Sequence, residues 1–318
     1  MNYWLLLAVF TFTAIFIVGL TQTRLSKLAL DKPNKRSLHT KLTPRTGGVA
    51  LMAGILAGWL TLEIPAYWFW LPLALISLSF IDDFKGLLAR WRFLGQFLVS
   101  AAFLIIQSNT LSPWLMAMLL IAMVWMVNLY NFMDGSDGLA GGMAIFGFSA
   151  YGIAAYYGLD IRLAMMNAII VFASLAFLLF NFNPARIFMG DSGSIPLGFL
   201  AAALGLVGYQ RGLWPYWFPI IVFSPFIVDA TLTLLKRLLH GEKIWHAHRS
   251  HYYQRLVQMG LGHRKTAIFE YCLMAFMAAS AILGLYHSAI VTALFVCWIA
   301  IYGLIIWIIN HKWRNFSA

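Results

Sequence analysis

The chain has 318 residues, of which 62% are hydrophobic and only 10% are charged, and its mean hydropathy is +0.79. This composition excludes an ordinary soluble domain and indicates a multi-pass membrane protein. The net charge of +11 does not predict a nucleic-acid partner, because the basic residues lie in short loops between apolar runs, where they orient membrane helices. Cys272 and Cys297 lie inside apolar segments without metal-ligand spacing, so neither a disulfide framework nor a thiolate metal site is predicted.

Eleven apolar segments are long enough to be interpreted as membrane spans. They predict an all-α, polytopic helical bundle that forms a single integral-membrane domain, residues 1–318. The first segment has no basic start and no cleavage site of the signal-peptide type, so we expect a retained helix. The expected spans are residues 3–20, 47–62, 66–81, 93–107, 112–130, 139–158, 162–180, 194–209, 214–235, 266–286 and 289–310.

The distribution of Lys and Arg predicts the orientation of the chain. If the N-terminus is periplasmic, 20 of the 22 basic residues fall in loops on one side, and only Arg162 and Arg211 fall on the other. Basic residues concentrate in cytoplasmic loops. We therefore expect the C-terminus to be cytoplasmic.

The acidic residues follow the same partition. Of eleven Asp and Glu, only Glu63 and Asp160 fall on the outer side. Five carboxylates follow spans that end on the inner side, and they can converge on one cytoplasmic cavity if the helices pack around it. These are Asp82, Asp83, Asp134, Asp137 and Asp191.

The stretch NLYNFMDGSDG, from Asn128 to Gly138, puts two amides, two carboxylates and two glycines directly after an apolar run. Carboxylates at the end of a membrane helix are costly unless water, a metal or a partner receives them. The glycines allow the backbone to turn and to approach a ligand closely. The stretch therefore predicts a site at the membrane surface, and the alternative is an ordinary polar turn between two helices.

The DDFKG stretch, from Asp82 to Gly86, has two adjacent carboxylates at the end of a span. Neighbouring acids repel each other, so they are stable beside a divalent cation or a basic ligand, or when one keeps its proton. Solvated interfacial acids are the alternative. Arg90 and Arg92 follow, either as an anchoring charge pair or as a clamp for a lipid phosphate.

The stretch NFNPARIFMGDSGS, from Asn181 to Ser194, breaks helical continuity at Pro184 and Gly190. Asp191 then precedes a turn rich in Gly and Ser, whose amides suit phosphate, while its carboxylate suits Mg²⁺. Phe188 either stacks on a base or packs as a buried aromatic.

Two basic loops complete the candidate site. The last loop carries Trp245, His246, His248, Arg249, His251 and Arg255. No Cys or Glu stands at a zinc-ligand spacing, so Arg and His there favour binding of anionic oxygen over zinc. In the first loop, Arg45 lies beside the turn-forming Pro44 and Gly47–Gly48. Both loops also suit a simple positive-inside anchor.

The motifs TPRTGG, DDFKG, NLYNFMDGSDGLAGG, NPARIFMGDSGS and HAHRSHYYQRL, in this order, resemble those of the polyprenyl-phosphate N-acetylhexosamine-1-phosphate transferases. That family, of the glycosyltransferase family 4 type, includes phospho-N-acetylmuramoyl-pentapeptide transferase. The likeness covers nearly the whole chain and looks greatest to the bacterial branch that starts O-antigen and related polysaccharides.

The resemblance implies transfer of a sugar 1-phosphate from a UDP-N-acetylhexosamine, such as the N-acetylfucosamine or N-acetylquinovosamine donor, to undecaprenyl phosphate, with release of UMP. It implies Mg²⁺ as cofactor, with Mn²⁺ as a substitute, and membrane lipid as surroundings; a homodimer is left open. The protein would lie in the bacterial inner membrane, with its active site on the cytoplasmic face.

The resemblance also assigns roles to residues. Asp82, Asp83, Asp191 and His251 would be catalytic, with Asp82 and Asp83 near the lipid phosphate and Asp191 the metal ligand. His251 matches the first histidine of the family's final His-x-His-His motif, but Tyr253 and Gln254 replace the later ones. The implied substrate-binding residues are Arg45, Arg92, Asn128, Asn131, Asp134, Asp137, Asn181, Phe188, Arg249 and Arg255.

Two other classes remain as alternatives. A transporter of an anionic metabolite would need ionisable groups near the bilayer midplane, whereas nearly all the acidic residues lie at the cytoplasmic ends of spans; Asp229, inside an expected span, is a partial exception. A lipid-phosphate phosphatase could use the same carboxylates and metal but would release inorganic phosphate instead of UMP.

Overall fold

The structure is a computed structural model that describes residues 2–23, 30–31, 38, 42–107, 112–243 and 248–317, without the side chains of residues 83–85 and 317. Almost all described segments are helical. The only strands in these segments are β1 (Leu30–Asp31) and β2 (Thr43–Pro44), which pair antiparallel. The helices are α1 (Tyr3–Gln22), α2 (Gly47–Trp59), α3 (Tyr67–Lys85), α4 (Ala89–Gln107), α5 (Pro113–Phe132), α6 (Leu139–Tyr157), α7 (Ile161–Asn181), α8 (Asp191–Gln210), α9 (Trp217–Val222), α10 (Ser224–Leu239), α11 (Tyr252–Leu256), α12 (Gly262–Tyr286) and α13 (Val291–Ser317).

Local sequence signals set where several helices begin. Ser112 accepts a hydrogen bond from the Leu115 amide and is followed by Pro113, whose missing N–H is not needed at the start of α5. Asp160 accepts the Leu163 amide at 2.9 Å and caps α7 in the same way. These caps satisfy amides that have no partner within the helix.

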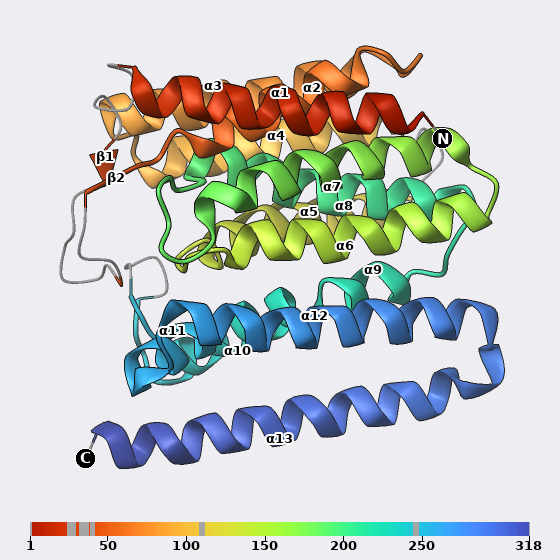
Figure 1. The fold of residues 1–318 in the computed structure, drawn as a ribbon. Helices are drawn as coiled ribbons and strands as arrows, with labels where there is room; N and C mark the ends of the chain where they lie inside the picture. Colours follow the sequence, from red (N-terminus) through yellow and green to blue (C-terminus); the bar gives the residue numbers. More distant parts are fainter. Residues whose placement is uncertain are drawn as a thin grey trace.

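The helices run back and forth along one long direction, and the termini lie at opposite ends of the bundle (Figure 1). Helix α6 packs along α7, and α5 packs along α8. Among the described helices long enough to cross a membrane, α8 is the most buried. In its most apolar 18 residues 83% of the residues are buried, compared with 6% in the segment that contains α13. Helix α8 is therefore a central element, and α13 is a peripheral helix whose apolar surface suits lipid.

The predicted all-α, multi-pass architecture is confirmed, but one expected span is shorter than expected and another is divided. Among the described residues, eight helices are long and apolar enough to cross a membrane. The span expected at residues 47–62 corresponds to the shorter helix α2, and the span expected at residues 66–81 coincides with α3. The expected span at residues 214–235 is divided into α9 and α10, because Pro225 at the start of α10 has no N–H to continue the preceding helix.

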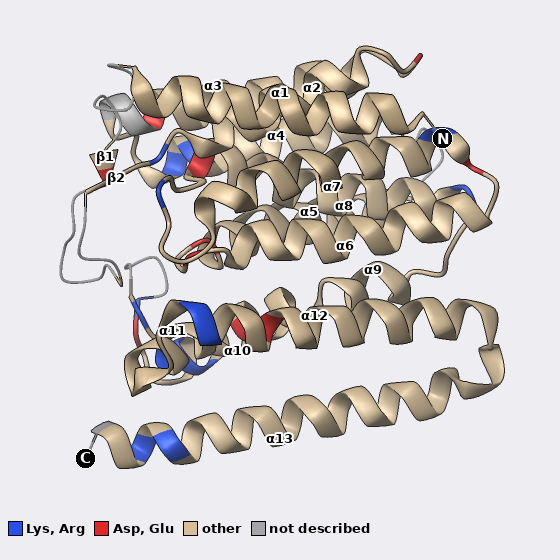
Figure 2. Ribbon diagram, viewed as in Figure 1, with Lys and Arg blue, Asp and Glu red and all other residues tan. Residues whose placement is uncertain are grey.

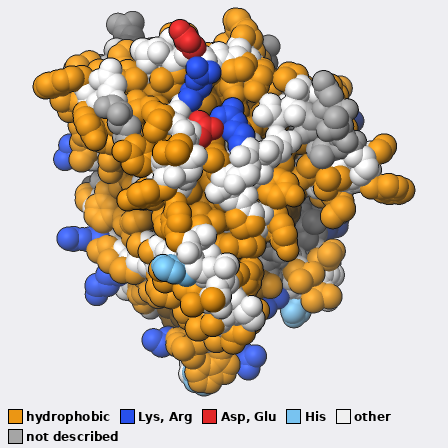
Figure 3. Space-filling view, turned by 90° about the vertical axis from the view of Figure 1, so that its right-hand side faces the viewer, with side chains coloured by type: hydrophobic (Ala, Val, Ile, Leu, Met, Phe, Trp, Pro, Cys, Tyr) orange, Lys and Arg blue, Asp and Glu red, His pale blue; other side chains and the backbone are white. Residues whose placement is uncertain are grey.

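Most of the Lys and Arg residues in the described segments lie at the end of the bundle where α13 finishes (Figure 2). The opposite end shows mainly hydrophobic side chains and few acidic ones (Figure 3), and there Arg211 pairs with Asp160 at 2.5 Å. The basic residues that the sequence assigns to one side of the membrane thus lie mostly at one end of the molecule. The assignment of those ends to cytoplasm and periplasm stays a prediction.

Glycines allow α2 to approach α8 closely at the basic end. The Gly47 and Gly48 amides donate to the carbonyls of Phe188 and Met189 at 3.0 and 2.9 Å. A Cβ on Gly48 would lie 2.3 Å from the backbone nitrogen of Gly193. This backbone contact holds the segment that follows β2 against the start of α8.

We expect Gly48→Ala to lower the stability of the protein by about 1–3 kcal/mol, because the added methyl group meets backbone that must shift. Gly303→Ala on α13 is the matched control, since a Cβ there meets no atom within 4 Å. Thermal unfolding of both variants in detergent measures the effect. Equal midpoints for the two variants would contradict the proposed close packing.

Candidate active site

Two cavities open near the basic end of the bundle, and Asn131 lines both. The first, which we name the acidic cavity, has a volume of about 230 Å³ and is lined by Asp31, Arg45, Asn131, Asp134, Gly135, Ser136, Asp137, Asn181, Phe188, Gly190, Asp191 and His263. The second, named the lateral cavity, has a volume of about 620 Å³ and lies between α4, α5 and α10. It is lined by Ala89, Arg92, Phe93, Gln96, Phe97, Leu120, Ile121, Val124, Trp125, Asn128, Asn131, Phe132, Ile195, Leu234, His248, His251 and Gln254.

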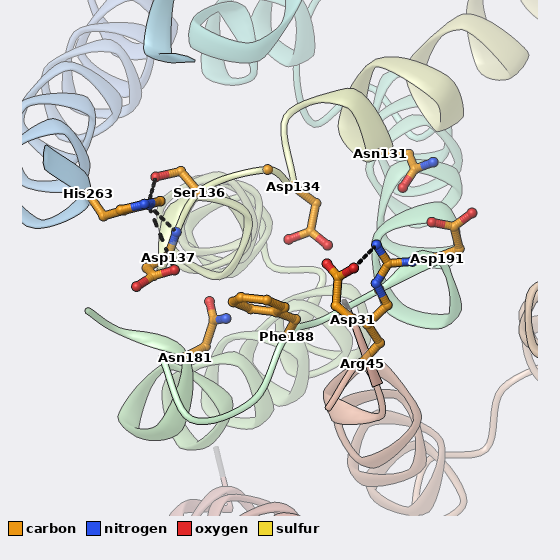
Figure 4. Close-up of a pocket in the computed structure, with 12 residues that line it drawn as sticks. Asp31, Arg45, Asn131, Asp134, Ser136, Asp137, Asn181, Phe188, Asp191 and His263 are labelled. Carbon is orange, nitrogen blue, oxygen red and sulfur yellow. Dashed lines mark hydrogen bonds and ion pairs between the residues drawn. The ribbon is translucent and has the colours of Figure 1, made fainter. Parts of the chain in front are cut away.

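The acidic cavity is formed by segments that are far apart in the sequence (Figure 4). The loop after α5 supplies Asp134 and Asp137, the loop after α7 supplies Phe188, and α8 begins at Asp191. Asp134 lies between the His263 group on one side and Asn131 with Asp191 on the other (Figure 4). The structure therefore brings the two predicted acidic motifs to one cavity.

Two predicted substrate-binding residues hold the loops of this cavity together. Asn181 accepts the Gly138 amide at 3.0 Å and donates to the Ile187 carbonyl at 2.9 Å. Asp137 accepts the Asn183 side chain at 2.7 Å and the Ala185 amide at 3.1 Å. Gly138 has φ +77°, a conformation that favours glycine and lets the chain turn into α6. These bonds join the loop after α5 to the loop after α7.

Arg92 connects Asp82 with Asp191. Its Nη1 lies 3.0 Å from Oδ2 of Asp82 and 3.3 Å from Oδ2 of Asp191. Asp82 also accepts the Leu87 amide at 2.6 Å, which holds the end of α3 against the start of α4. Arg92 belongs to the lateral cavity and Asp191 to the acidic one, so this ion pair lies where the cavities meet. The Asp83 side chain lies outside the described residues.

Asp134 lies deep in the acidic cavity, surrounded by protein but still partly exposed to the opening. Burial raises the pKa of Asp134 well above its usual range, and the negative charge of Asp191 raises it further. The Arg45 guanidinium and the Gly190 amide lower it, but by less. A cation beside the two carboxylates would relieve this repulsion.

The oxygen donors of the acidic cavity fit Mg²⁺. Asp134, Asp191 and the amide of Asn131 line it together. Within the described segments there is no group of three or more His, Cys, Asp or Glu residues that could hold a metal alone. Mg²⁺ commonly binds through one or two carboxylates, with water and substrate phosphates completing its coordination, so two carboxylates and an amide suffice.

The lateral cavity has a polar end and an apolar body. Its polar residues include Arg92, Asn128 and His251, and aromatic and aliphatic side chains form most of the remainder. The Asn128 side chain donates to Gln96 Oε1 at 2.7 Å and to the Val124 carbonyl at 2.8 Å, which fixes its amide on the cavity wall. This arrangement suits an elongated apolar ligand with an anionic head.

The other predicted site residues differ in placement. Arg45 lines the acidic cavity and pairs with Asp31 at 2.8 Å. Arg249 is exposed, and Arg255 donates to Ser250 and Asn310, beside the ring of Trp313 on α13. Neither Arg249 nor Arg255 lines either cavity. Trp245 and His246 lie outside the described residues.

The sequence motifs did not identify His263, which lines the acidic cavity from the start of α12. Its Nε2 faces the Leu38 carbonyl at 3.1 Å, so that nitrogen donates, and in the neutral ring Nδ1 accepts from the Ser136 hydroxyl at 2.9 Å. His263 therefore links the first loop to the loop after α5. Only the three-dimensional fold brings its partners together, because Ser136 is 127 positions away in the chain.

The sequence was compared with family models and with known proteins, and both comparisons point to one family of membrane transferases. The all-helical bundle with an acidic cavity and an adjoining lateral cavity fits a membrane-embedded transferase, and residues 65–209 match the model of glycosyl transferase family 4. A decaprenyl-phosphate N-acetylglucosaminephosphotransferase of Mycobacterium leprae is 30% identical over 86% of this chain and 82% of its own length. The chain belongs to glycosyl transferase family 4.

Two further relatives cover much of the chain. A probable undecaprenyl-phosphate N-acetylglucosaminyl 1-phosphate transferase of Bacillus subtilis is 29% identical over 91% of this chain and 87% of its own length. A phospho-N-acetylmuramoyl-pentapeptide-transferase of Listeria monocytogenes is 29% identical over 70% of this chain and 77% of its own length. Both matches extend well beyond residues 65–209.

We expect Asp134→Asn to raise the thermal midpoint of the metal-free protein by a few degrees at pH 8. Because the pKa of Asp134 is raised on folding, its ionisation disfavours the folded state, and stability falls as pH rises through the raised pKa. The advantage of the variant should therefore shrink as pH is lowered. Unfolding in detergent with chelator measures it, with the exposed Glu63→Gln as control; a midpoint difference that does not change with pH would contradict the assignment.

Proposed function

We propose that this protein transfers an N-acetylhexosamine 1-phosphate from a UDP-sugar to undecaprenyl phosphate, in a Mg²⁺-dependent reaction at the cytoplasmic face of the bacterial inner membrane. The products are undecaprenyl-diphosphate-sugar and UMP. The observation that carries the proposal is the contact between Arg92 in the lateral cavity and Asp191 in the acidic cavity. It places the positively charged guanidinium of Arg92 between a candidate lipid-phosphate site and a candidate nucleotide site.

The acidic cavity is the candidate donor site. Phe188 offers an aromatic face in the cavity, and Arg45 offers a guanidinium beside Asp191 and Asp134 (Figure 4). A guanidinium recognises phosphate oxygens, and an aromatic ring stacks on a base. These residue types suit a nucleotide diphosphate held with a cation.

The lateral cavity is the candidate acceptor site. It lies between α4 and α5, two helices whose apolar side chains are largely exposed, as expected for contact with lipid. The polyprenyl chain would lie along Phe97, Ile121 and Trp125, and its phosphate would reach Arg92. An acceptor could enter this cavity from the bilayer without leaving it.

The chemistry requires positioning more than a protein nucleophile. An oxygen of the lipid phosphate attacks the β-phosphorus of the UDP-sugar, the bond between the α- and β-phosphoryl groups breaks, and UMP leaves. The acceptor phosphate has a second pKa of about 6, so much of it is already dianionic near pH 7 and no strong base is needed. Arg92 would hold the attacking phosphate, while Asp82 fixes the guanidinium.

Asp191, Asp134 and the Asn131 amide would hold Mg²⁺, which when bound neutralises charge on the diphosphate. Ser194 donates to the Asn131 oxygen at 2.7 Å and keeps that amide oriented. The acidic side chains would thus act through charge and position.

The sugar is the finer part of the proposal. The named functions of two relatives point to N-acetylglucosamine 1-phosphate. The 6-deoxy sugars N-acetylquinovosamine and N-acetylfucosamine are suggested only by the resemblance of the sequence motifs to one branch of the family. With any of these sugars, the lipid product would start an O-antigen or another cell-surface polysaccharide.

Membranes that contain the protein, incubated with undecaprenyl phosphate and each of the three UDP-sugars, test the proposal. We expect release of UMP that requires Mg²⁺ and stops on chelation. Release of inorganic phosphate from the lipid would indicate a phosphatase, and uptake of the anion without turnover would indicate a transporter. Either result without UMP would overturn the proposal.

We expect Asp191→Asn to lower UMP release by about 100-fold or more, because the amide removes a negative ligand beside the diphosphate. Glu63→Gln, an exposed carboxylate at the opposite end of the bundle, is the matched control. Steady-state assays at saturating Mg²⁺ compare the two. Turnover by Asp191→Asn equal to that of the control would exclude a role for Asp191 in metal binding.

We expect Val124→Trp to raise the KM for undecaprenyl phosphate at least about 5-fold and to leave the KM for the UDP-sugar unchanged, because the larger ring fills the lateral cavity. Ile105→Trp on the exposed surface of α4 is the control, since Ile105 is 60% exposed and does not line the cavity. A larger change in the KM for the UDP-sugar than in that for the lipid would reverse the assignment of the two cavities.

A further inference from the structure

Asp229 is a buried carboxylate on α10 that neither cavity includes. It accepts the amides of Tyr252 and Tyr253, each at 2.9 Å, and the hydroxyl of Thr233 at 3.1 Å. Its Oδ1 also lies 3.3 Å from Nδ1 of His251. These groups are donors to an acceptor-only carboxylate, so Asp229 organises the segment around it.

The first consequence concerns the start of α11. The first amides of a helix have no partner within the helix, and they favour a negative charge. Asp229 supplies that charge from a different helix and fixes where α11 begins relative to α10. His251 is the residue just before α11, and its own amide donates to Gln254 Oε1 at 3.1 Å.

The second consequence concerns His251. The ring is 3% exposed and stacks beside His248 and Phe132, with centroid distances of 4.8 and 6.2 Å. With Nδ1 directed at Asp229, Nε2 is the nitrogen available to the lateral cavity that His251 lines. A carboxylate partner keeps the proton on Nδ1, so Nε2 of the neutral ring is an acceptor.

The third consequence reaches the acidic cavity. Tyr253, whose amide Asp229 accepts, donates its hydroxyl to the Phe132 carbonyl at 3.1 Å. A Cβ on Gly135 would lie 2.2 Å from that hydroxyl, so Tyr253 packs directly against the loop that carries Asp134. The side chain of Tyr253 thus supports the acidic cavity from behind.

We propose that Asp229 is a positioning residue that fixes His251 for the lateral cavity and, through Tyr253, the loop of Asp134 for the acidic cavity. The kinetic part of this inference rests on the proposed function. This chain carries Tyr253 and Gln254 where the family's final motif has histidines, and both residues then have a structural role. Tyr253 supports the loop that carries Asp134, and Gln254 accepts the amide of His251, the residue before α11.

The state of the His251 ring gives a test that needs no substrate. The protein contains eight histidines, and ¹⁵N-histidine NMR of the full-length protein in lipid, with His251→Ala to assign the signal, reports which ring nitrogen carries a proton. We expect Nδ1 of His251 to be protonated. In Asp229→Ala the acceptor for that proton is lost, so the fraction of rings that carry the proton on Nδ1 should fall. An unprotonated Nδ1 in the wild type, or no change in the variant, would overturn the inference even if the proposed function fails.

The kinetic test is a double-mutant cycle. We expect Asp229→Asn and His251→Ala each to lower kcat about 10-fold or more. The kcat of the double variant should lie within about 2-fold of that of His251→Ala. Multiplication of the two effects would show that Asp229 does not act through His251. The wild-type enzyme in the same assay reports on the proposed function itself.

Tyr253→Phe tests the link to the acidic cavity separately from the link to His251, because it removes only the hydroxyl that donates to the Phe132 carbonyl. We expect a KM for the UDP-sugar raised about 3-fold or more, with the KM for undecaprenyl phosphate unchanged. Equal KM values for both substrates in this variant and the wild type would remove the link to the acidic cavity.

Asp160→Asn is the control for loss of a helix-capping carboxylate, since Asp160 caps α7 at the far end of the bundle. It should leave kcat and both KM values within about 2-fold. Thermal midpoints of all variants show whether each one is folded at the assay temperature. A similar loss of kcat in folded Asp160→Asn and Asp229→Asn would also overturn the proposal, since the effect would then not depend on His251.

Discussion

The repulsion among carboxylates gathered in one cleft at the end of the bundle is the constraint on which the rest of the structure depends. Asp82 and Asp191 share the guanidinium of Arg92, and Asp134 lies close enough to Asp191 for its pKa to rise. Such an arrangement is unfavourable unless cations or amides offset it. The buried helix α8 and its glycine contact with α2 hold the acids together despite this cost. Carboxylates that repel one another in this way are suited to bind a cation together with an anionic substrate.

Much of the fold could be predicted from the sequence because apolar runs against polar loops are a strong signal in a membrane protein. The expected spans coincide with helices, and the all-α architecture is confirmed. The division of residues 214–235 was missed because hydropathy measures composition and gives no weight to Pro225, whose missing N–H separates α10 from α9. The short α2 was counted as a full span because the apolar stretch continues into the turn after Trp59.

The candidate site could be predicted in part, for a different reason. Asp134 and Asp191 are conspicuous as charges in an apolar chain, and the structure places both in the acidic cavity. His263 and Asp229 have no local motif, since their partners lie far away in the sequence or on another helix. Arg255 looked like a phosphate ligand because it lies near histidines, yet it contacts Asn310 of α13. Side-chain direction in a loop is set by tertiary packing, which residue type alone does not reveal.

Asn131 lines both cavities, so the two cavities adjoin at this side chain. One molecule with a polar head and an alkyl tail can therefore bridge them without an extended linker. When two binding groups are joined, the second binds at a high effective concentration, and affinity can rise by about 10²–10⁴-fold without any new contact. A ligand that spans Asn131 would exploit this geometry, and its head and tail could be optimised separately before they are joined.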